Sequence, residues 1–144
     1  MISDDINAIS RMLAVQILYS RQLSKNVDLN DLIERISCDQ DSECELEYNN
    51  DLLIKLLSYN DNNEVLSREL IKKHLKPTWN IDRLDKILYI NILLAIAEMS
   101  YVEKNKINKN DILNHYVTIA HMFLDEKEVR FVKSILQNIW NYLK

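Results

Sequence analysis

Apolar residues recur every three or four positions along most of the chain, which is the spacing of amphipathic helices. The pattern is clear over residues 5–22, where Ile9, Leu13 and Ile17 form one stripe. Similar stripes predict further helices: a short one over 29–36, a third from 52, a fourth over 65–75, a fifth from about 80, a sixth ending near 123 and a last one over 131–143. The fourth stripe consists of Val65, Leu66, Leu70, Ile71 and Leu75. The sequence shows no strand pattern and no internal repeat, so the chain is predicted to be all-α, with six or seven helices.

Polar residues and the single proline predict where several helices begin and end. Pro77 ends the fourth helix because its ring cannot continue one. Asn80 is predicted to cap the fifth helix, whose interior is apolar almost all round and should therefore be buried. Either Asn108 or Asn110 is predicted to cap the sixth. The stretch 38–51 holds six acids and no base, and is predicted to be a solvated loop or a helix end.

Length and composition exclude several classes of protein. With 144 residues the chain is predicted to be one domain, 1–144, with a core of its own. It contains no glycine, so glycine-rich phosphate loops and dinucleotide fingerprints cannot form. Cys38 and Cys44 lack the spacing of a zinc site and are expected to be free thiols. No apolar run reaches the roughly 18 residues that span a bilayer, and no signal peptide is evident, so a cytoplasmic protein without membrane contact is expected.

The histidines give no sign of catalytic or metal chemistry. His115 and His121 are six residues apart, so on a helix they point about 120° away from each other and cannot bind one metal together. His74 stands alone, and the sequence shows neither a Ser-His-Asp nor a Cys-His arrangement. The chain is therefore predicted to have no cofactor, no metal site and no enzymatic activity.

Charge is unevenly distributed along the chain. Residues 1–72 hold 7 bases and 14 acids, a net charge of −7, whereas residues 73–144 hold 11 bases and 8 acids, a net charge of +3. Phosphate binding depends on locally clustered Lys and Arg rather than on the total charge. An anionic partner is therefore expected to contact the second half.

Three stretches, taken in order, resemble one family. "AVQILYSRQLS" places Ala, Gln and a Leu-aromatic pair in the first helix. In "KHLKPTWNIDRL", continuing to "AEMSYVE", Trp79 is followed by Asp82, Arg83 and, 19 residues after the Trp, Glu98. "LNHYVTIAHMFLDEKEVRFVKSIL" holds the residues of two paired last helices: Asn114, Val117, Ala120, Phe123, Phe131, Val132 and Leu136. Together these stretches resemble the NusB family of bacterial transcription antitermination factors.

The resemblance implies a NusB-like fold, in which the helices form two packed bundles. It also implies a function, which is the binding of boxA-type RNA in ribosomal RNA leaders together with NusE, a small-subunit ribosomal protein. Through this pair the chain would act indirectly on the RNA polymerase elongation complex and support processive transcription of ribosomal RNA. A homodimer is a further state that the resemblance allows.

The chain departs from the family pattern where the family carries charged residues. In the family several arginines precede the first helix, whereas this chain has Asn7 and Ala8 there and keeps only Arg11. In the fifth helix three uncharged residues replace an acid-Arg pair and a second Arg: Leu88, Tyr89 and Leu93. The isolated chain is therefore expected to bind RNA weakly, and NusE is expected to raise its affinity.

Basic residues around an aromatic ring suit RNA, because the cations hold phosphates while the ring stacks on a base. Such a group lies in the last helix, and the resemblance adds two residues of the first. The predicted RNA-binding residues are Arg11, Tyr19, Lys127, Arg130, Phe131 and Lys133. The alternative for the basic residues is a solvated helix face. For Tyr19 it is a half-buried surface position, and for Phe131 a core or rim position in register with Ile135.

Other conspicuous residues are predicted to be structural. Trp79 is predicted to be buried and to anchor the two bundles. Glu98 lies in an apolar helix and is expected to pair with a base, because an unpaired buried carboxylate is costly. A second basic cluster is predicted to be only a solvated loop: Lys104, Lys106 and Lys109.

Two other functions stay open at this point. One is a protein-interaction module that keeps the fold without the RNA site. The other is an accessory domain, since NusB-like domains also occur at the front of ribosomal-RNA cytosine methyltransferases. That alternative requires the chain to be a fragment, because it contains no methyl-donor domain.

Overall fold

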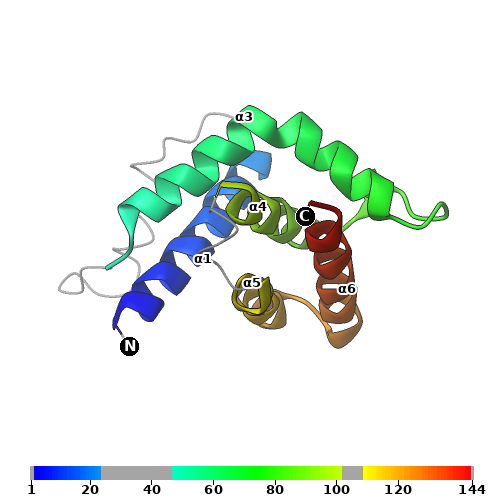
Figure 1. The fold of residues 1–144 in the computed structure, drawn as a ribbon. Coiled ribbons are helices and arrows are strands. Elements are labelled where there is room, and N and C mark those ends of the chain that lie inside the picture. Colours follow the sequence, from blue (N-terminus) through cyan, green and yellow to red (C-terminus); the bar gives the residue numbers. More distant parts are fainter. Residues whose placement is uncertain (1, 24–46, 102–108, 144) are drawn as a thin grey trace. The chain divides into compact units, whose positions relative to one another are not determined.

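The computed structural model describes residues 2–23, 47–101 and 109–143 (Figure 1). These residues form helices without any strand: α1 (Ile2–Leu23), α3 (Asn50–His74), the 3-10 helix η1 (Ile81–Arg83), α4 (Lys86–Tyr101), α5 (Lys109–Phe123) and α6 (Glu126–Leu143). They belong to two compact units, Met1–Lys55 and Leu56–Lys144. The all-α prediction is confirmed. The helix predicted over 29–36, both cysteines, Lys104 and Lys106 lie outside the described residues.

In the first unit, Ser10 of α1 and Asn49 before α3 bond to each other. Ser10 is fully buried, and its Oγ accepts a hydrogen bond from the Asn49 backbone N–H at 2.6 Å. The Asn49 side chain donates to Asn7 Oδ1 at 3.0 Å and accepts from the Leu52 backbone N–H at 3.1 Å, so it also caps α3. Asn7, which stands where the family pattern has a basic residue, therefore takes part in a contact within the unit.

α3 consists of two helical segments that meet at a kink at Asn63, in keeping with the two helices that the sequence predicts here. The Asn63 backbone is non-helical, with φ −128° and ψ 15°. Its side-chain Nδ2 donates to the carbonyl of Tyr59 at 2.9 Å. A side chain that bonds the carbonyl four residues earlier competes with the helical backbone bond, and this competition bends the helix.

The buried face of the second half of α3 differs from the predicted stripe. Val65 and Leu66 are 75% and 70% exposed, whereas Ile71 is buried. The buried positions before Ile71 are polar: Asn60 and Ser67. The helical spacing of three to four residues is thus kept by polar side chains, which a search for apolar stripes does not detect. Val65 and Leu66 thus mark a helix, as the sequence predicts, but they do not belong to its buried face.

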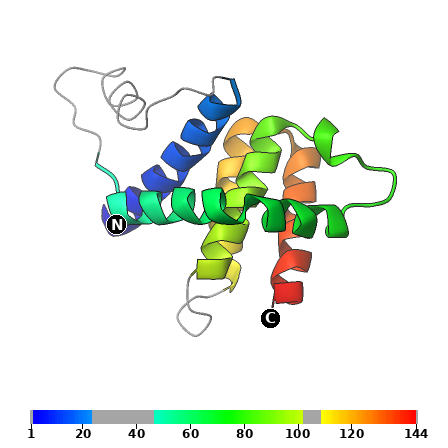
Figure 2. The ribbon, with the colours of Figure 1, turned by 90° about the horizontal axis from the view of Figure 1, so that it is seen from above.

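α4 is the central helix of the second unit, as the sequence predicts. All residues from Ile90 to Met99 are buried, and α5 and α6 pack against α4 and against each other (Figures 1 and 2). Asn91 Nδ2 donates to the Tyr116 backbone carbonyl at 2.9 Å. Glu98, which the sequence predicts to pair with a base, accepts a hydrogen bond from the Tyr116 hydroxyl at 2.8 Å. Both bonds join α4 to α5 through buried polar groups.

α4 and α6 each begin at an aspartate cap. The sequence predicts that Asn80 caps the fifth helix, but its side chain accepts from the Asp82 backbone N–H at 2.9 Å and caps η1. Asp85 caps α4 instead, by accepting from two backbone N–H groups at 2.9 and 3.2 Å. At α6, Asp125 accepts from the Glu128 backbone N–H at 2.8 Å, and the Glu128 carboxylate accepts from the Asp125 N–H at 3.2 Å. This reciprocal arrangement is a capping box, which defines where α6 starts.

Candidate nucleic-acid interface

Trp79 and Phe131 form a stacked pair at the surface of the second unit. Their ring centroids are 4.7 Å apart and their planes differ by 8°. Trp79 follows Pro77 in the segment between α3 and η1, where its backbone N–H donates to the carbonyl of Lys76 at 2.9 Å. A proline in the second position of such a turn presets its geometry. The turn therefore brings the indole to the ring that α6 presents.

The exposure of Trp79 corrects the prediction that this side chain is a buried anchor. Its surface is 41% exposed, whereas that of Trp140 in α6 is 7% exposed. Phe131, for which the sequence leaves a core and a surface position open, is half-buried. The indole thus lies on a partly open ring and not in the core, because the turn after α3 runs over the surface.

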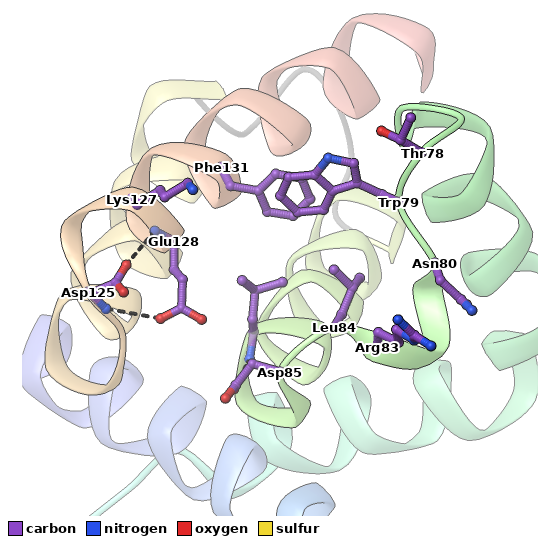
Figure 3. A pocket seen from close by; sticks show the side chains of 11 residues that line it. Thr78, Trp79, Asn80, Arg83, Leu84, Asp85, Asp125, Lys127, Glu128 and Phe131 are labelled. Carbon is purple, nitrogen blue, oxygen red and sulfur yellow. Dashed lines mark hydrogen bonds between the residues drawn. The ribbon is translucent and has the colours of Figure 1, made fainter.

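The stacked rings line an open hollow of about 480 Å³, which we call the ring hollow (Figure 3). Leu84 and Leu88 add apolar surface to it, and the first turn of α6 lies on another side. Sites for small ligands typically enclose about 300–1,000 Å³. Aromatic walls are the surfaces on which unpaired nucleobases stack. The size and the lining therefore suit a flat ring.

Three carboxylates line the ring hollow: Asp85, Asp125 and Glu128. In each of them one oxygen accepts from a backbone N–H at a helix start, as described for the caps of α4 and α6. Figure 3 marks the two bonds between Asp125 and Glu128. The second oxygen of each has no hydrogen-bond partner among the described residues. No group of three His, Cys, Asp or Glu in the described part of the chain is arranged to hold a metal ion. The carboxylates are thus oriented acceptors for a ligand that donates hydrogen bonds.

Two exposed cations, Arg83 and Lys127, also line the ring hollow. With the three carboxylates, the formal charge of the lining is −1. A phosphate inside the hollow would meet like charge, whereas a neutral ring with donor groups would not. The charge of the ring hollow therefore favours a neutral nucleobase over a phosphate.

A second open hollow, of about 500 Å³, shares Thr78, Trp79 and Asn80 with the first. We call it the basic hollow, because its charged residues carry a formal charge of +2: Arg68, Lys72, Lys76 and Asp82. The three basic residues, Arg68, Lys72 and Lys76, follow each other at four-residue spacing in α3 and just after it. This spacing is a sequence signal that could have identified the cluster, because residues four apart share a helix face.

Tyr89 of α4 lies close to the basic hollow. The Arg68 guanidinium lies 5.9 Å from the centroid of its ring and is also bonded to Asp82. Burial raises the pKa of Tyr89 above its ordinary value of 10.0. Tyr89 therefore packs against the Arg68 guanidinium of α3. The family pattern has a charged residue at this position.

The predicted RNA-binding residues of α6 do not all share one face. At about 100° per residue, Lys127 lies about 40° and Arg130 about 100° from Phe131 in the same direction, whereas Lys133 lies about 160° away. All three bases are exposed. Lys127 thus lies nearest to Phe131 around the helix, Arg130 lies at about a right angle to it, and Lys133 lies nearly opposite.

The predicted RNA-binding residues of α1 belong to the first unit. Arg11 is buried, with 6% of its surface exposed, and Tyr19 is half-buried. A phosphate contact needs an accessible guanidinium. The RNA contacts of both residues stay predictions, and the burial of Arg11 does not favour its contact.

The sequence matches the model of the NusB family over residues 8–141. The chain belongs to the NusB family. It is similar to "Transcription antitermination protein NusB" of Ligilactobacillus salivarius (strain UCC118), with 30% identity over 129 residues that cover 90% of this chain and 93% of that protein. The protein of the same name from Bacillus pumilus (strain SAFR-032) is 28% identical over 135 residues, which cover 94% of this chain and 95% of the relative. These relatives are named as antitermination proteins and not as enzymes.

Solved structures show the same fold. The chain superimposes on T. maritima NusB with a TM-score of 0.74 and 20% identity, over 93% of this chain and 89% of that one. It also superimposes on a chain in a crystal structure of a plectonemic RNA supercoil, with a TM-score of 0.73 and 22% identity over 93% of each chain. The NusB-like fold that the sequence predicts is thereby confirmed. Among the described helices of this NusB-family chain, none combines the length and the apolar character needed to cross a membrane.

Proposed function

We propose that this NusB-family chain is an antitermination factor that binds boxA-type RNA of ribosomal RNA leaders together with NusE. Its place in the family, whose members are named transcription antitermination proteins, supports the general role. The observation that carries the RNA-binding part is the exposed stack of Trp79 on Phe131, with the exposed Lys127 one helical turn before Phe131 in α6. The function involves no catalytic step.

In this proposal the rings and the cations have separate tasks. An unpaired nucleobase that stacks on an aromatic side chain contributes about 1–3 kcal/mol to the binding free energy, and this contribution depends little on which base it is. Lys127 and Arg130 hold phosphates, a contribution that falls as salt rises because bound counterions are released. Lys133 contributes less because it lies farther around α6. Arg11 and Tyr19 are further proposed contacts.

NusE is the proposed protein partner, and the RNA polymerase elongation complex is reached through it. The first 72 residues carry a net charge of −7, and Asn7 and Ala8 supply no cation at the start of α1. Both features weaken the attraction of the isolated chain for RNA. A bound partner that adds its own RNA contacts compensates for this loss. A homodimer is a further proposed state of the chain without NusE.

Binding of labelled boxA-type RNA, measured with and without the cognate NusE, tests this proposal. We expect weak binding by the chain alone at physiological salt and an affinity several-fold higher with NusE. A scrambled RNA of equal length serves as control. Tight binding by the isolated chain would show that the missing basic residues are unimportant. No boxA-dependent binding in either mixture would contradict the proposed function.

A protein-interaction module without RNA binding is the second candidate. Val65 and Leu66 expose 75% and 70% of their surfaces on α3, and exposed apolar patches mark many protein-protein contacts. Binding of NusE that persists when RNA binding is absent would favour this candidate.

A further inference from the structure

We propose that Trp79 divides a single nucleotide site, with a phosphate in the basic hollow and an unpaired base that bears an exocyclic amino group in the ring hollow. This inference rests on the proposed RNA-binding function. It assigns the part of a nucleotide that each hollow binds, and it names the nucleobases that the site prefers.

The two hollows have opposite charge and a common wall. The lining of the ring hollow carries a formal charge of −1 and that of the basic hollow +2, and Thr78, Trp79 and Asn80 line both. A nucleotide is divided in the same way, since its phosphate is anionic while its base is a neutral ring with hydrogen-bonding edges. An RNA strand that passes over Trp79 can therefore place a phosphate on the positively charged side of the indole and a nucleobase on the other side.

The carboxylates of the ring hollow select bases through their amino groups. The helix caps hold one oxygen of Asp85, Asp125 and Glu128, so the second oxygen of each is fixed and free to accept. Cytosine presents an N4 amino donor and adenine an N6 amino donor, whereas the O4 of uracil is an acceptor. An oxygen of Glu128 bonds the amino group and repels O4. The site therefore prefers cytosine to uracil, two bases with rings of the same size.

The basic side chains that line the basic hollow are arranged to receive a phosphate. The ammonium group of Lys76 has no partner among the described residues. Arg68 is bonded to Asp82, with 37% of its side chain exposed, and a guanidinium that holds one carboxylate keeps further N–H donors for a second anion. Lys72 lies 3.7 Å from Glu69, with 51% of its side chain exposed. The pairing of Arg68 thus fixes its position without using all of its donors.

The first test compares the binding of oligocytidine and oligouridine RNAs of ten nucleotides each, which match in length, charge and ring size. Affinities for the full chain are measured by fluorescence anisotropy at low salt. We expect the cytidine oligomer to bind about fivefold or more tightly, since a good base-edge contact discriminates by at least that much. Glu128→Gln places an NH₂ donor where the free oxygen lies and keeps the capping box. We expect this variant to lose the preference or to invert it, with an unchanged helical content.

The second test removes the phosphate contact alone. Lys76→Gln is expected to weaken both oligomers equally and to reduce the slope of log affinity against log salt by about 0.7, the contribution of one phosphate contact on a single strand. The preference for cytidine should stay as in the wild type. Lys55→Gln, which changes an exposed lysine that lines neither hollow, is the matched control and should leave the slope unchanged.

The outcomes separate this inference from the proposed function. Equal affinity for the two oligomers, a preference that Glu128→Gln leaves intact, or a salt slope unaffected by Lys76→Gln would overturn the divided site. The proposed function would still stand if boxA-type RNA bound with NusE. Failure of the chain to bind any of these RNAs, with or without NusE, would overturn both.

Discussion

The indole of Trp79 lies parallel to the ring of Phe131, with 4.7 Å between their centroids, although one residue follows α3 and the other belongs to α6. The contact leaves 41% of the Trp79 surface exposed. A stack of this kind contributes less to stability than a core aromatic and leaves ring surface for a ligand. The pair is therefore expected to matter more for binding than for folding.

Trp79→Ala should lower the free energy of unfolding by about 1–3 kcal/mol, less than the roughly 3–5 kcal/mol that removal of a fully buried aromatic residue costs. Urea unfolding followed by circular dichroism measures the difference. Trp140→Ala is the matched control, because that side chain is 7% exposed and its removal should cost the larger amount. Equal losses for the two variants would mean that Trp79 is an internal anchor after all.

Phe131→Leu should weaken RNA binding at every salt concentration without changing the slope of log affinity against log salt. The reason is that stacking releases no counterions, whereas binding of a phosphate does. Leucine keeps the residue apolar, so stability should change little. Tyr19→Leu tests in the same way whether α1 contributes a ring. A changed slope in either variant would argue against a stacking role for that residue.

Reversal of Lys127 and Arg130 to Glu should abolish RNA binding while helicity and thermal stability stay nearly unchanged, because both side chains are exposed. Neutral single variants, Lys127→Gln and Arg130→Gln, should each reduce the salt slope by about 0.7, because each removes one phosphate interaction with single-stranded RNA.

Lys133→Glu is the control on the same helix and should have a smaller effect, because Lys133 lies about 160° from Phe131. Reversal of Lys104 and Lys106 should also matter less. If reversal of Lys104 and Lys106 abolishes binding while the reversal in α6 does not, the interface lies elsewhere on the protein.

Tyr89 should make stability fall at alkaline pH. Burial raises the pKa of Tyr89, so the folded chain keeps its phenolic proton at a pH where the unfolded chain has lost it. The contribution of this group to stability is fully present below the unfolded pKa, about 10, and is lost as pH rises through the folded pKa. In Tyr89→Phe the free energy of unfolding should fall less between pH 9 and pH 11, about one unit on either side of that value. Parallel curves for the two proteins would contradict the assignment.

The sequence by itself determined the helical class, the buried character of α4 and the end of α5 at Phe123. These features depend on residues three or four positions apart, because helical periodicity places such residues on one face. The same local rule failed in α3, where polar Asn60 and Ser67 occupy the buried face while Val65 and Leu66 are exposed.

Only the tertiary structure decided which residues of distant segments meet. Asp85 caps α4 and Asp125 caps α6, and nothing in their local sequence indicates that both carboxylates line one hollow with Trp79. The sequence could place Lys127 beside Phe131, since both lie in one helix, but Asp85 joins Asp125 and Glu128 only once α4 and α6 have packed. Helix packing brings these helix starts and the turn after α3 together, and such contacts leave no periodic signal in the chain.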